Sequence, residues 1–374
     1  MPPAPSASAP APSASASQVY TWEPSNAAIA ARYGLRPEHV SRFDTNTSPA
    51  APDWLPAALR GPFDPPLNEY PDSSYAELTA AAAAYVGARP DEVIVGAGAD
   101  EVIDLVAKAY LGPADGALVP VPTYSMYGVL TSQRGARIVA VPRRGASEHF
   151  ALDLDAAVAR LAEVAVVWLC TPNNPTGTND DEATVLALLA AAAAQPRPPL
   201  VVIDEAYFEF TGESHVGWRE QFEQLLVVRT LSKAFALPGI RVGYGVAGRP
   251  VIERLERVRP PGSISTVSAG LGALALRSPD YARVNAAALG AERDWLAGRL
   301  DVAGWPATPS VTNFLLVRIG DHAAAEDAAE GLLRAGIVPR TFGPANPLRG
   351  HLRLTVRSRA ENERLLEAVA ALVG

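Results

Sequence analysis

The chain has 374 residues, of which 48% are hydrophobic and 19% are charged, a balance typical of a globular protein large enough for more than one core. Its formal net charge of −8 argues against general binding to nucleic acids or to anionic membranes. The single cysteine, Cys170, excludes an intrachain disulfide, and the five histidines show no metal-ligand spacing, so we expect no metal and a cytoplasmic location.

Residues 1–17, "MPPAPSASAPAPSASAS", are rich in proline, alanine and serine. They have neither a basic start nor an apolar centre, which predicts a disordered tail and not a signal peptide. Residues 18–64 are expected to form an N-terminal arm and part of a smaller domain. Apolar runs along the chain stay below the 18 or more residues typical of a membrane span, so we expect no membrane segment.

From about residue 75 onward, helix-like and strand-like segments alternate. The runs "VVWLC" (166–170) and "LVVID" (200–204) are apolar without alternation, as expected of central strands covered on both faces. Residues 65–262 are therefore predicted to form an α/β domain with a mostly parallel sheet flanked by helices, with chemistry at its strand ends. After residue 262, Ala-rich helices and the strands "NFLLVRI" and "HLRLTV" predict a smaller α+β domain over 263–374.

Lysine is unusually rare in this chain. The 32 basic residues include only two lysines, Lys108 and Lys233, and all the others are arginine. Lys108 lies in the helix-like segment "EVIDLVAKAYLG", where a solvated surface position explains it. Arginine carries charge as well as lysine does on a surface, but it cannot act as an amine nucleophile. Lys233, in "TLSKAF", is therefore a candidate for covalent chemistry.

The segment "VIVGAGADE" predicts a strand, a glycine turn and a helix that begins near Ala99. The first N–H groups of such a helix can bind an anion. The case for a nicotinamide cofactor is weak, because Glu101 stands where the dinucleotide fingerprint requires a third glycine. We therefore expect a phosphate site of some kind here.

Two further strands end in polar loops. "CTPNNPTGT" exposes the amides of Asn173 and Asn174, and "VVIDEAYFEF" ends with Asp204 and Tyr207. Lys233 follows further along the chain, as does Arg241. Together these side chains offer an amine for an aldehyde, a carboxylate for a pyridinium nitrogen, and donors for a phenolate and a phosphate.

The motifs "LNEYPD", "GAGADE", "PTYSMY", "TPNNPTG", "DEAYFEF", "TLSKAFALPGIRVGY" and "LRLTV" occur in this order from about residue 40 to the C-terminus. In this the chain resembles the fold-type I, pyridoxal-phosphate-dependent class I/II aminotransferases, and most of all the histidinol-phosphate aminotransferases. The resemblance implies a pyridoxal 5'-phosphate cofactor, an amino donor, a 2-oxo acid acceptor and a homodimer, with no nucleic-acid or membrane partner.

The resemblance also implies a role for individual residues. Lys233 matches the Schiff-base lysine and Asp204 the partner of the ring nitrogen, and Asn174 and Tyr207 match the donors to the ring oxygen. The remaining cofactor contacts that it implies are ring stacking by Tyr124 and phosphate binding by the backbone of Ala99 and Asp100, by Thr230, Ser232 and Arg241 and, from the neighbouring subunit, by Tyr70. The substrate contacts that it implies are Arg353 for the α-carboxylate, Arg340 for a distal anionic group, Asn46, and Tyr20 or Trp22 for a phosphate.

The sequence departs from that family at the substrate end. "NTSPAA" keeps Asn46 and Pro49 but lacks the family's acid and glycine, and Arg357 follows "LRLTV" where the family often has glycine. Three functions therefore stay open. They are transamination of histidinol phosphate with 2-oxoglutarate, transamination of aromatic or various amino acids, and decarboxylation of a phosphorylated amino acid on the same fold.

Overall fold

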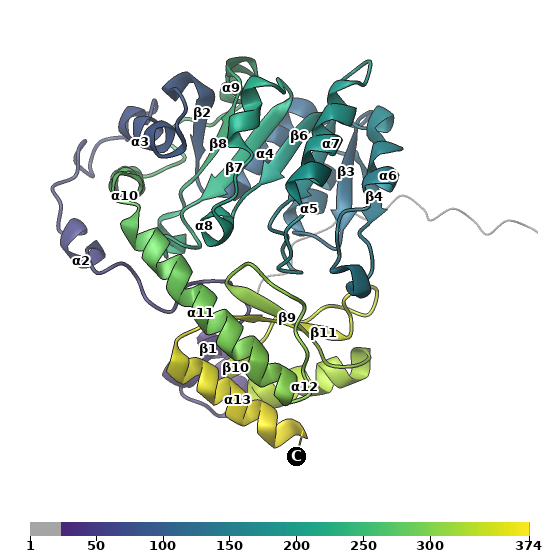
Figure 1. Ribbon diagram of the computed structural model, residues 1–374. Helices are drawn as coiled ribbons and strands as arrows, with labels where there is room; N and C mark the ends of the chain where they lie inside the picture. The colour runs from purple at the N-terminus through teal and green to yellow at the C-terminus, as the bar shows by residue number, and fades with distance from the viewer. Residues whose placement is uncertain (1–23, 374) are drawn as a thin grey trace, which may run out of the picture.

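The computed structural model describes residues 24–373, so the predicted tail, Tyr20 and Trp22 lie outside the described residues. Its main feature is a seven-stranded sheet with the strand order β2-β8-β7-β6-β5-β3-β4 (Figure 1). The strands of this sheet are β2 (Val93–Gly96), β3 (Gly116–Val121), β4 (Arg137–Pro142), β5 (Val166–Cys170), β6 (Leu200–Asp204), β7 (Leu225–Thr230) and β8 (Gly243–Ala247).

The sheet is mostly parallel, and β8 is the one strand of the seven that runs against its neighbours, β2 and β7. Strands β5, β6 and β7 are buried along their whole length. Alternate residues of each strand enter two different cores, for instance Leu169 on one face and Trp168 on the other. Because these strands are covered on both faces, their sequences are uninterrupted apolar runs. The prediction of a mostly parallel sheet flanked by helices is confirmed.

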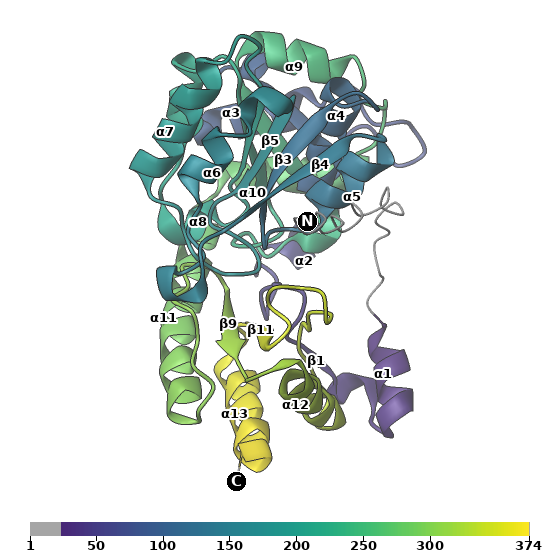
Figure 2. The ribbon, with the colours of Figure 1, turned by 90° about the vertical axis from the view of Figure 1, so that its right-hand side faces the viewer.

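Helices cover both faces of this sheet (Figure 2). Those that pack on one face are α3 (Ala76–Val86), α6 (Leu154–Val158), α7 (Glu182–Ala193) and α10 (Thr266–Arg277). Those that pack on the other are α4 (Ala99–Tyr110), α5 (Met126–Gln133) and α9 (Arg249–Glu256). None of the helices within residues 24–373 is long and apolar enough to cross a membrane.

A second, smaller unit has its own core below the sheet (Figure 1). Strands β9 (Phe314–Arg318) and β11 (His351–Thr355) pair antiparallel, and β1 (Ser41–Arg42) pairs parallel with β10 (Ile337–Val338). Its helices are α11 (Asp280–Val302), α12 (His322–Arg334) and α13 (Arg359–Val373). Phe43 is fully buried in this core, so part of the N-terminal segment packs with the C-terminal one. Shorter helices are α1 (Asn26–Tyr33), α2 (Leu55–Ala58) and α8 (Phe208–Thr211).

The two cores meet along α11, which runs from the sheet to the smaller unit (Figure 1). Ile264 and Ala273, and Ala286 early in α11, belong to the core of the large sheet, whereas Leu296 and Leu300 belong to the second core. We therefore propose that the division between the units falls within α11 and not at residue 262. The change in sequence pattern at 262 reflects a change to Ala-rich helices, which continue to pack on the sheet.

Candidate active site

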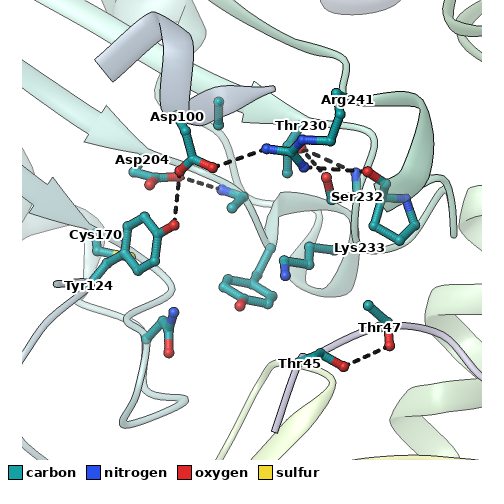
Figure 3. A pocket seen from close by; sticks show the side chains of 15 residues that line it. Thr45, Thr47, Asp100, Tyr124, Cys170, Asp204, Thr230, Ser232, Lys233 and Arg241 are labelled. Atoms are coloured by element: carbon teal, nitrogen blue, oxygen red, sulfur yellow. Dashed lines mark hydrogen bonds and ion pairs between the residues drawn. The ribbon is translucent and has the colours of Figure 1, made fainter. Parts of the chain in front are cut away.

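A cavity of about 230 Å³ lies beside the carboxyl ends of β5, β6 and β7 (Figure 3). This is where ligands bind in open α/β sheets, because polar loops follow the buried strands there. Its lining residues are Thr45, Thr47, Ala99, Asp100, Tyr124, Cys170, Asn174, Asp204, Ala206, Tyr207, Thr230, Ser232, Lys233, Pro238 and Arg241. Ten of the residues predicted from the sequence are therefore brought to one cavity.

Lys233 extends into this cavity from the loop that follows β7 (Figure 3). Its amine nitrogen lies 5.7 Å from the centre of the Tyr207 ring. Burial, followed by the positive charge of Arg353, lowers the pKa of this amine from 10.5 to about 8. A substantial fraction of the amine is therefore neutral near pH 8 and able to act as a nucleophile or base.

Asp204 is the last residue of β6 and is 4% exposed. The Ala206 N–H donates to its Oδ1 at 3.0 Å, and the hydroxyl of Tyr127 donates to its Oδ2 at 2.7 Å. Burial raises the pKa of this carboxyl to about 6, and both hydrogen bonds act against that rise. A cationic N–H group in the cavity would stabilise the carboxylate, which is what a protonated ring nitrogen offers.

Hydroxyl and guanidinium donors lie together beside Asp100 and the start of α4, where we infer an anion site. Thr230 donates from Oγ1 to Ser232 Oγ at 2.9 Å, and both hydroxyls face the cavity together with Arg241. The first N–H groups of α4, from Ala99 onward, have no acceptor within their own helix. This combination of helix N-terminus, hydroxyls and arginine suits a phosphate.

Two glycines allow Arg241 and the start of α4 to approach the neighbouring backbone closely. Gly98, which precedes α4, has φ +83°, and a Cβ atom there would lie 2.7 Å from Nη2 of Arg241. A Cβ atom on Gly243, at the start of β8, would lie 2.3 Å from the Ala99 nitrogen. Larger residues would therefore displace the arginine or the helix start.

Asp100 connects the anion site to Tyr124. Its Oδ1 accepts from the Tyr124 hydroxyl at 2.8 Å, and its Oδ2 accepts from Nη2 of Arg241 at 3.1 Å (Figure 3). The sequence suggested that Asp100 acts through its backbone. Its side chain has the additional effect of fixing an aromatic ring and an arginine on two sides of the cavity.

Tyr207 follows β6 and is 2% exposed. Its hydroxyl accepts a hydrogen bond from the Asn46 amide at 2.9 Å and keeps its own hydrogen for another acceptor. Asn46 has φ +53° and is itself buried, with its backbone N–H donating to Thr355. Asn46 therefore lies behind Tyr207, and its neighbours Thr45 and Thr47 line the cavity in its place.

Arg353, on β11 of the smaller unit, reaches the edge of the site. Its Nη1 donates to Oδ1 of Asn174 at 2.6 Å, and its Nη2 donates to the Asp44 carbonyl. Its Nε is buried and has no hydrogen-bond acceptor among residues 24–373. The backbones of Arg340 and Arg353 form two hydrogen bonds, in which the N–H of each residue donates to the carbonyl oxygen of the other at 3.0 Å. The two arginines thus lie together, and the charge of Arg340 contributes to lowering the pKa of Arg353 to about 10, after the larger effect of burial.

Tyr70 does not reach this cavity within one chain. Its side chain is 94% exposed, beside a separate surface hollow that includes Asp72 and Tyr75. The position is compatible with a contact to a second subunit, which stays a prediction. Within the part of the chain that the structure describes, no cluster of three His, Cys, Asp or Glu side chains is arranged for a metal.

Sequence reasoning missed Tyr127, Thr45 and Thr47. Tyr127 lies on α5, three residues after Tyr124, which precedes that helix, so both tyrosines belong to the motif "PTYSMY". Thr45 and Thr47 flank Asn46, the expected substrate contact, in "DTNTS".

Known proteins resemble this chain in sequence and in fold. Residues 40–369 match the family described as aminotransferase class I and II. The chain belongs to this aminotransferase family. The aminotransferase is 36% identical over 311 residues to the histidinol-phosphate aminotransferase of Thermoanaerobacter pseudethanolicus, a match that covers 82% of this chain and 85% of the relative. It is 33% identical over 349 residues to the chloroplastic histidinol-phosphate aminotransferase of Nicotiana tabacum. This match covers 91% of this chain and 81% of the relative.

The fold of this aminotransferase also has close structural counterparts. The histidinol-phosphate aminotransferase from Sinorhizobium meliloti in complex with pyridoxal-5'-phosphate superposes with a TM-score of 0.85 at 23% identity, covering 95% of both chains. The predicted fold, a fold-type I aminotransferase with a large sheet and a smaller unit, is confirmed.

Proposed function

We propose that this aminotransferase uses pyridoxal 5'-phosphate to transfer the amino group of histidinol phosphate to 2-oxoglutarate. The observation that carries the proposal is the joint presence, in one cavity, of the Lys233 amine, the buried Asp204 carboxylate and an anion site of hydroxyls, Arg241 and a helix start. The donor set fits a ring that carries a phosphate, an aldehyde and a basic nitrogen. The named relatives support the choice of substrate.

When bound, pyridoxal phosphate supplies an aldehyde for the amino group and a ring that accepts electrons from the substrate Cα. Thr230, Ser232, Arg241 and the start of α4 would bind the phosphate, and Asp204 would hold the ring nitrogen in its protonated form. Tyr124 would cover one face of the ring. Asn174, whose amide oxygen is taken by Arg353, would donate from its nitrogen to the ring oxygen together with Tyr207.

Lys233 would have two tasks in each half-reaction. Its amine would bind the cofactor in the resting enzyme, and as a free base it would move a proton between the substrate Cα and the cofactor. The pKa near 8 suits a group that must both hold and release a proton close to neutral pH.

The substrate end must accept two different anions. Histidinol phosphate has a phosphate and no α-carboxylate, whereas glutamate has two carboxylates. We propose that Arg353 binds the α-carboxylate of glutamate and the phosphate of the other substrate, with Arg340 beside it. The hydrogen bond from Nη1 of Arg353 to Asn174 supports this role, since Asn174 lines the cavity and the bond places the guanidinium at its edge.

Assays of the purified enzyme with 2-oxoglutarate test the substrate directly. We expect glutamate formation with histidinol phosphate to be faster than with phenylalanine or tyrosine at equal concentration. Turnover of aromatic donors without turnover of histidinol phosphate would favour a broad aminotransferase. Release of carbon dioxide from a phosphorylated amino acid, without glutamate formation, would favour the decarboxylase.

Arg353 and Arg340 should differ in their effects on substrates. We expect Arg353→Ala to impair both half-reactions and Arg340→Ala to impair anionic-tail substrates while sparing phenylalanine. A charge-assisted hydrogen bond contributes about 1.5–3 kcal/mol, so kcat/KM should fall roughly ten- to a hundredfold for each such bond that a variant removes. Single-turnover rates for each half-reaction measure this. Equal losses for histidinol phosphate and phenylalanine in Arg340→Ala would contradict the assignment.

Tyr70 should act across a homodimer. We expect a dimer in solution, because the exposed Tyr70 reaches no cofactor site within its own chain. Subunits carrying Tyr70→Phe, mixed with subunits carrying Lys233→Ala, should form heterodimers in which one site has neither change. Activity above that of both parent proteins is therefore expected after mixing and reassembly. No gain on mixing, or a fully active monomer by light scattering, would contradict the prediction.

A further inference from the structure

Tyr127 lies directly behind Asp204, on α5. Its side chain is fully buried, and its hydroxyl donates to Oδ2 of Asp204 at 2.7 Å. The other carboxylate oxygen, Oδ1, accepts from the Ala206 N–H at 3.0 Å. Each oxygen of Asp204 thus has one donor from the protein. The plane of the carboxylate is fixed by these two contacts before any ligand enters.

The ring of Tyr127 is held as firmly as its hydroxyl. It stacks on Trp168 with ring centres 5.4 Å apart and an angle of 6° between the planes. The Trp168 indole N–H is in turn bound to Thr131 at 3.2 Å. Tyr127 also makes an edge-to-face contact with Tyr124, with ring centres 5.6 Å apart and an angle of 84° between the ring planes. A shift of Tyr127 would therefore disturb both Asp204 and the ring that lines the cavity.

We propose that Tyr127 is a positioning residue, which holds the Asp204 carboxylate toward the cofactor ring nitrogen and keeps it ionised. This inference rests on the proposed function, because it takes Asp204 as the partner of that nitrogen. Tyr127 is not among the residues that line the cavity. It acts through the hydrogen bond to Asp204 and through its contact with Tyr124.

The charge of Asp204 depends on groups from several elements. Burial raises its pKa most, and the negative charge of Asp100, from the start of α4, raises it further. The hydrogen bonds from Tyr127 and Ala206 lower it, as does the positive charge of Lys233. The phenols of Tyr124 and Tyr207 and the thiol of Cys170 also face the carboxyl.

Loss of the Tyr127 hydroxyl therefore removes a contribution that lowers the pKa of Asp204. The carboxyl would then stay protonated up to a higher pH. A protonated carboxyl cannot hold a positive charge on the ring nitrogen, so the acidic limb of the pH–rate profile should move to higher pH.

The test is Tyr127→Phe in the holoenzyme, a change that keeps the ring and removes one oxygen. The matched control is Tyr244→Phe, which removes a buried hydroxyl from the core on the opposite face of the same sheet. For Tyr127→Phe we expect kcat at pH 7.5 to fall about tenfold, KM for the amino donor to change less than about twofold, and cofactor loss on dialysis to accelerate. Both the acidic limb and the pH titration of the visible absorption band should move to higher pH. The control should match the wild type in all five measurements.

A double variant separates a positioning role from a packing role. If Tyr127 acts through Asp204, Tyr127→Phe should accelerate cofactor loss in the wild-type background but not in Asp204→Asn. An equal effect in both backgrounds, or a Tyr127→Phe enzyme with wild-type pH profile and cofactor retention, would overturn the proposal. If the wild type binds no cofactor, the proposed function fails as well. If the wild type and Asp204→Asn behave as expected and only Tyr127→Phe is silent, the positioning role alone fails.

Discussion

Replacing Lys233 by arginine should abolish transamination while leaving the fold intact. Arginine keeps the positive charge but stays protonated, so it offers neither a nucleophilic amine nor a base. With the pKa of Lys233 lowered to about 8, roughly a quarter of the amine is neutral at pH 7.5, whereas practically none of an arginine is. We expect turnover to fall more than about a thousandfold. Stopped assays with histidinol phosphate and 2-oxoglutarate measure this loss.

The matched control is Lys108→Arg, at the other lysine of the chain. Lys108 is on α4 and pairs with Asp104 at 2.6 Å on the surface, where an arginine can take its place. Activity and melting temperature should stay at wild-type values in this control. Lys233→Arg should still bind pyridoxal phosphate through the anion site, but borohydride treatment should no longer fix it to the protein. Retention of the label after borohydride in Lys233→Arg would move the covalent site to another residue.

The pH dependence of cofactor incorporation should also depend on Lys233. The neutral amine is the reactive form, and its fraction rises with pH up to and through the lowered pKa near 8. The rate at which the cofactor-free enzyme takes up pyridoxal phosphate should therefore increase from pH 6.5 to about pH 9 and change little above it. A surface lysine with an ordinary pKa would show a rise that continues toward about pH 10.

The fold of the sheet could be predicted because its strands differ so clearly from their surroundings. β5 and β6 are uninterrupted apolar runs between polar loops, and the structure buries every residue of both. The direction of β8 could not be predicted, since a run of apolar residues looks the same whether a strand is parallel or antiparallel. The sequence also did not indicate that one continuous helix, α11, contributes Ala286 to one core and Leu296 to the other.

The candidate site could be predicted as far as each residue follows a strand of the sheet. Tyr124, Asn174 and Lys233 come after β3, β5 and β7. Asp204 ends β6, and the parallel arrangement brings these strand ends together. The contacts from the smaller unit could not be derived this way. The hydrogen bond from the Asn46 amide to Tyr207 joins residues 161 positions apart, and the one from Arg353 to Asn174 joins residues 179 positions apart.

Replacing Asp204 by asparagine should lower transamination by about a thousandfold while raising the melting temperature of the cofactor-free protein at neutral pH. The activity falls because asparagine cannot hold a positive charge on the ring nitrogen, and the ring then accepts electrons less well. The stability rises because a buried carboxylate is removed, while the asparagine oxygen can still accept from Tyr127. A residue with a purely structural role would show the opposite change in stability.

The rise in stability should depend on pH in a defined way. Burial raises the pKa of Asp204 from 3.8 to about 6, so the ionised form is less stable in the folded protein than in the unfolded chain. That penalty is absent below about pH 4, grows between about pH 4 and pH 6, and stays constant above, so the advantage of Asp204→Asn should appear over the same interval. Asp180→Asn is the control, because this buried carboxylate pairs with Arg143 at 3.0 Å and its loss should lower the melting temperature at pH 7.5. If Asp204→Asn instead melts lower at pH 7.5, or keeps activity within a few-fold of wild type, the partner of the ring nitrogen must be sought elsewhere.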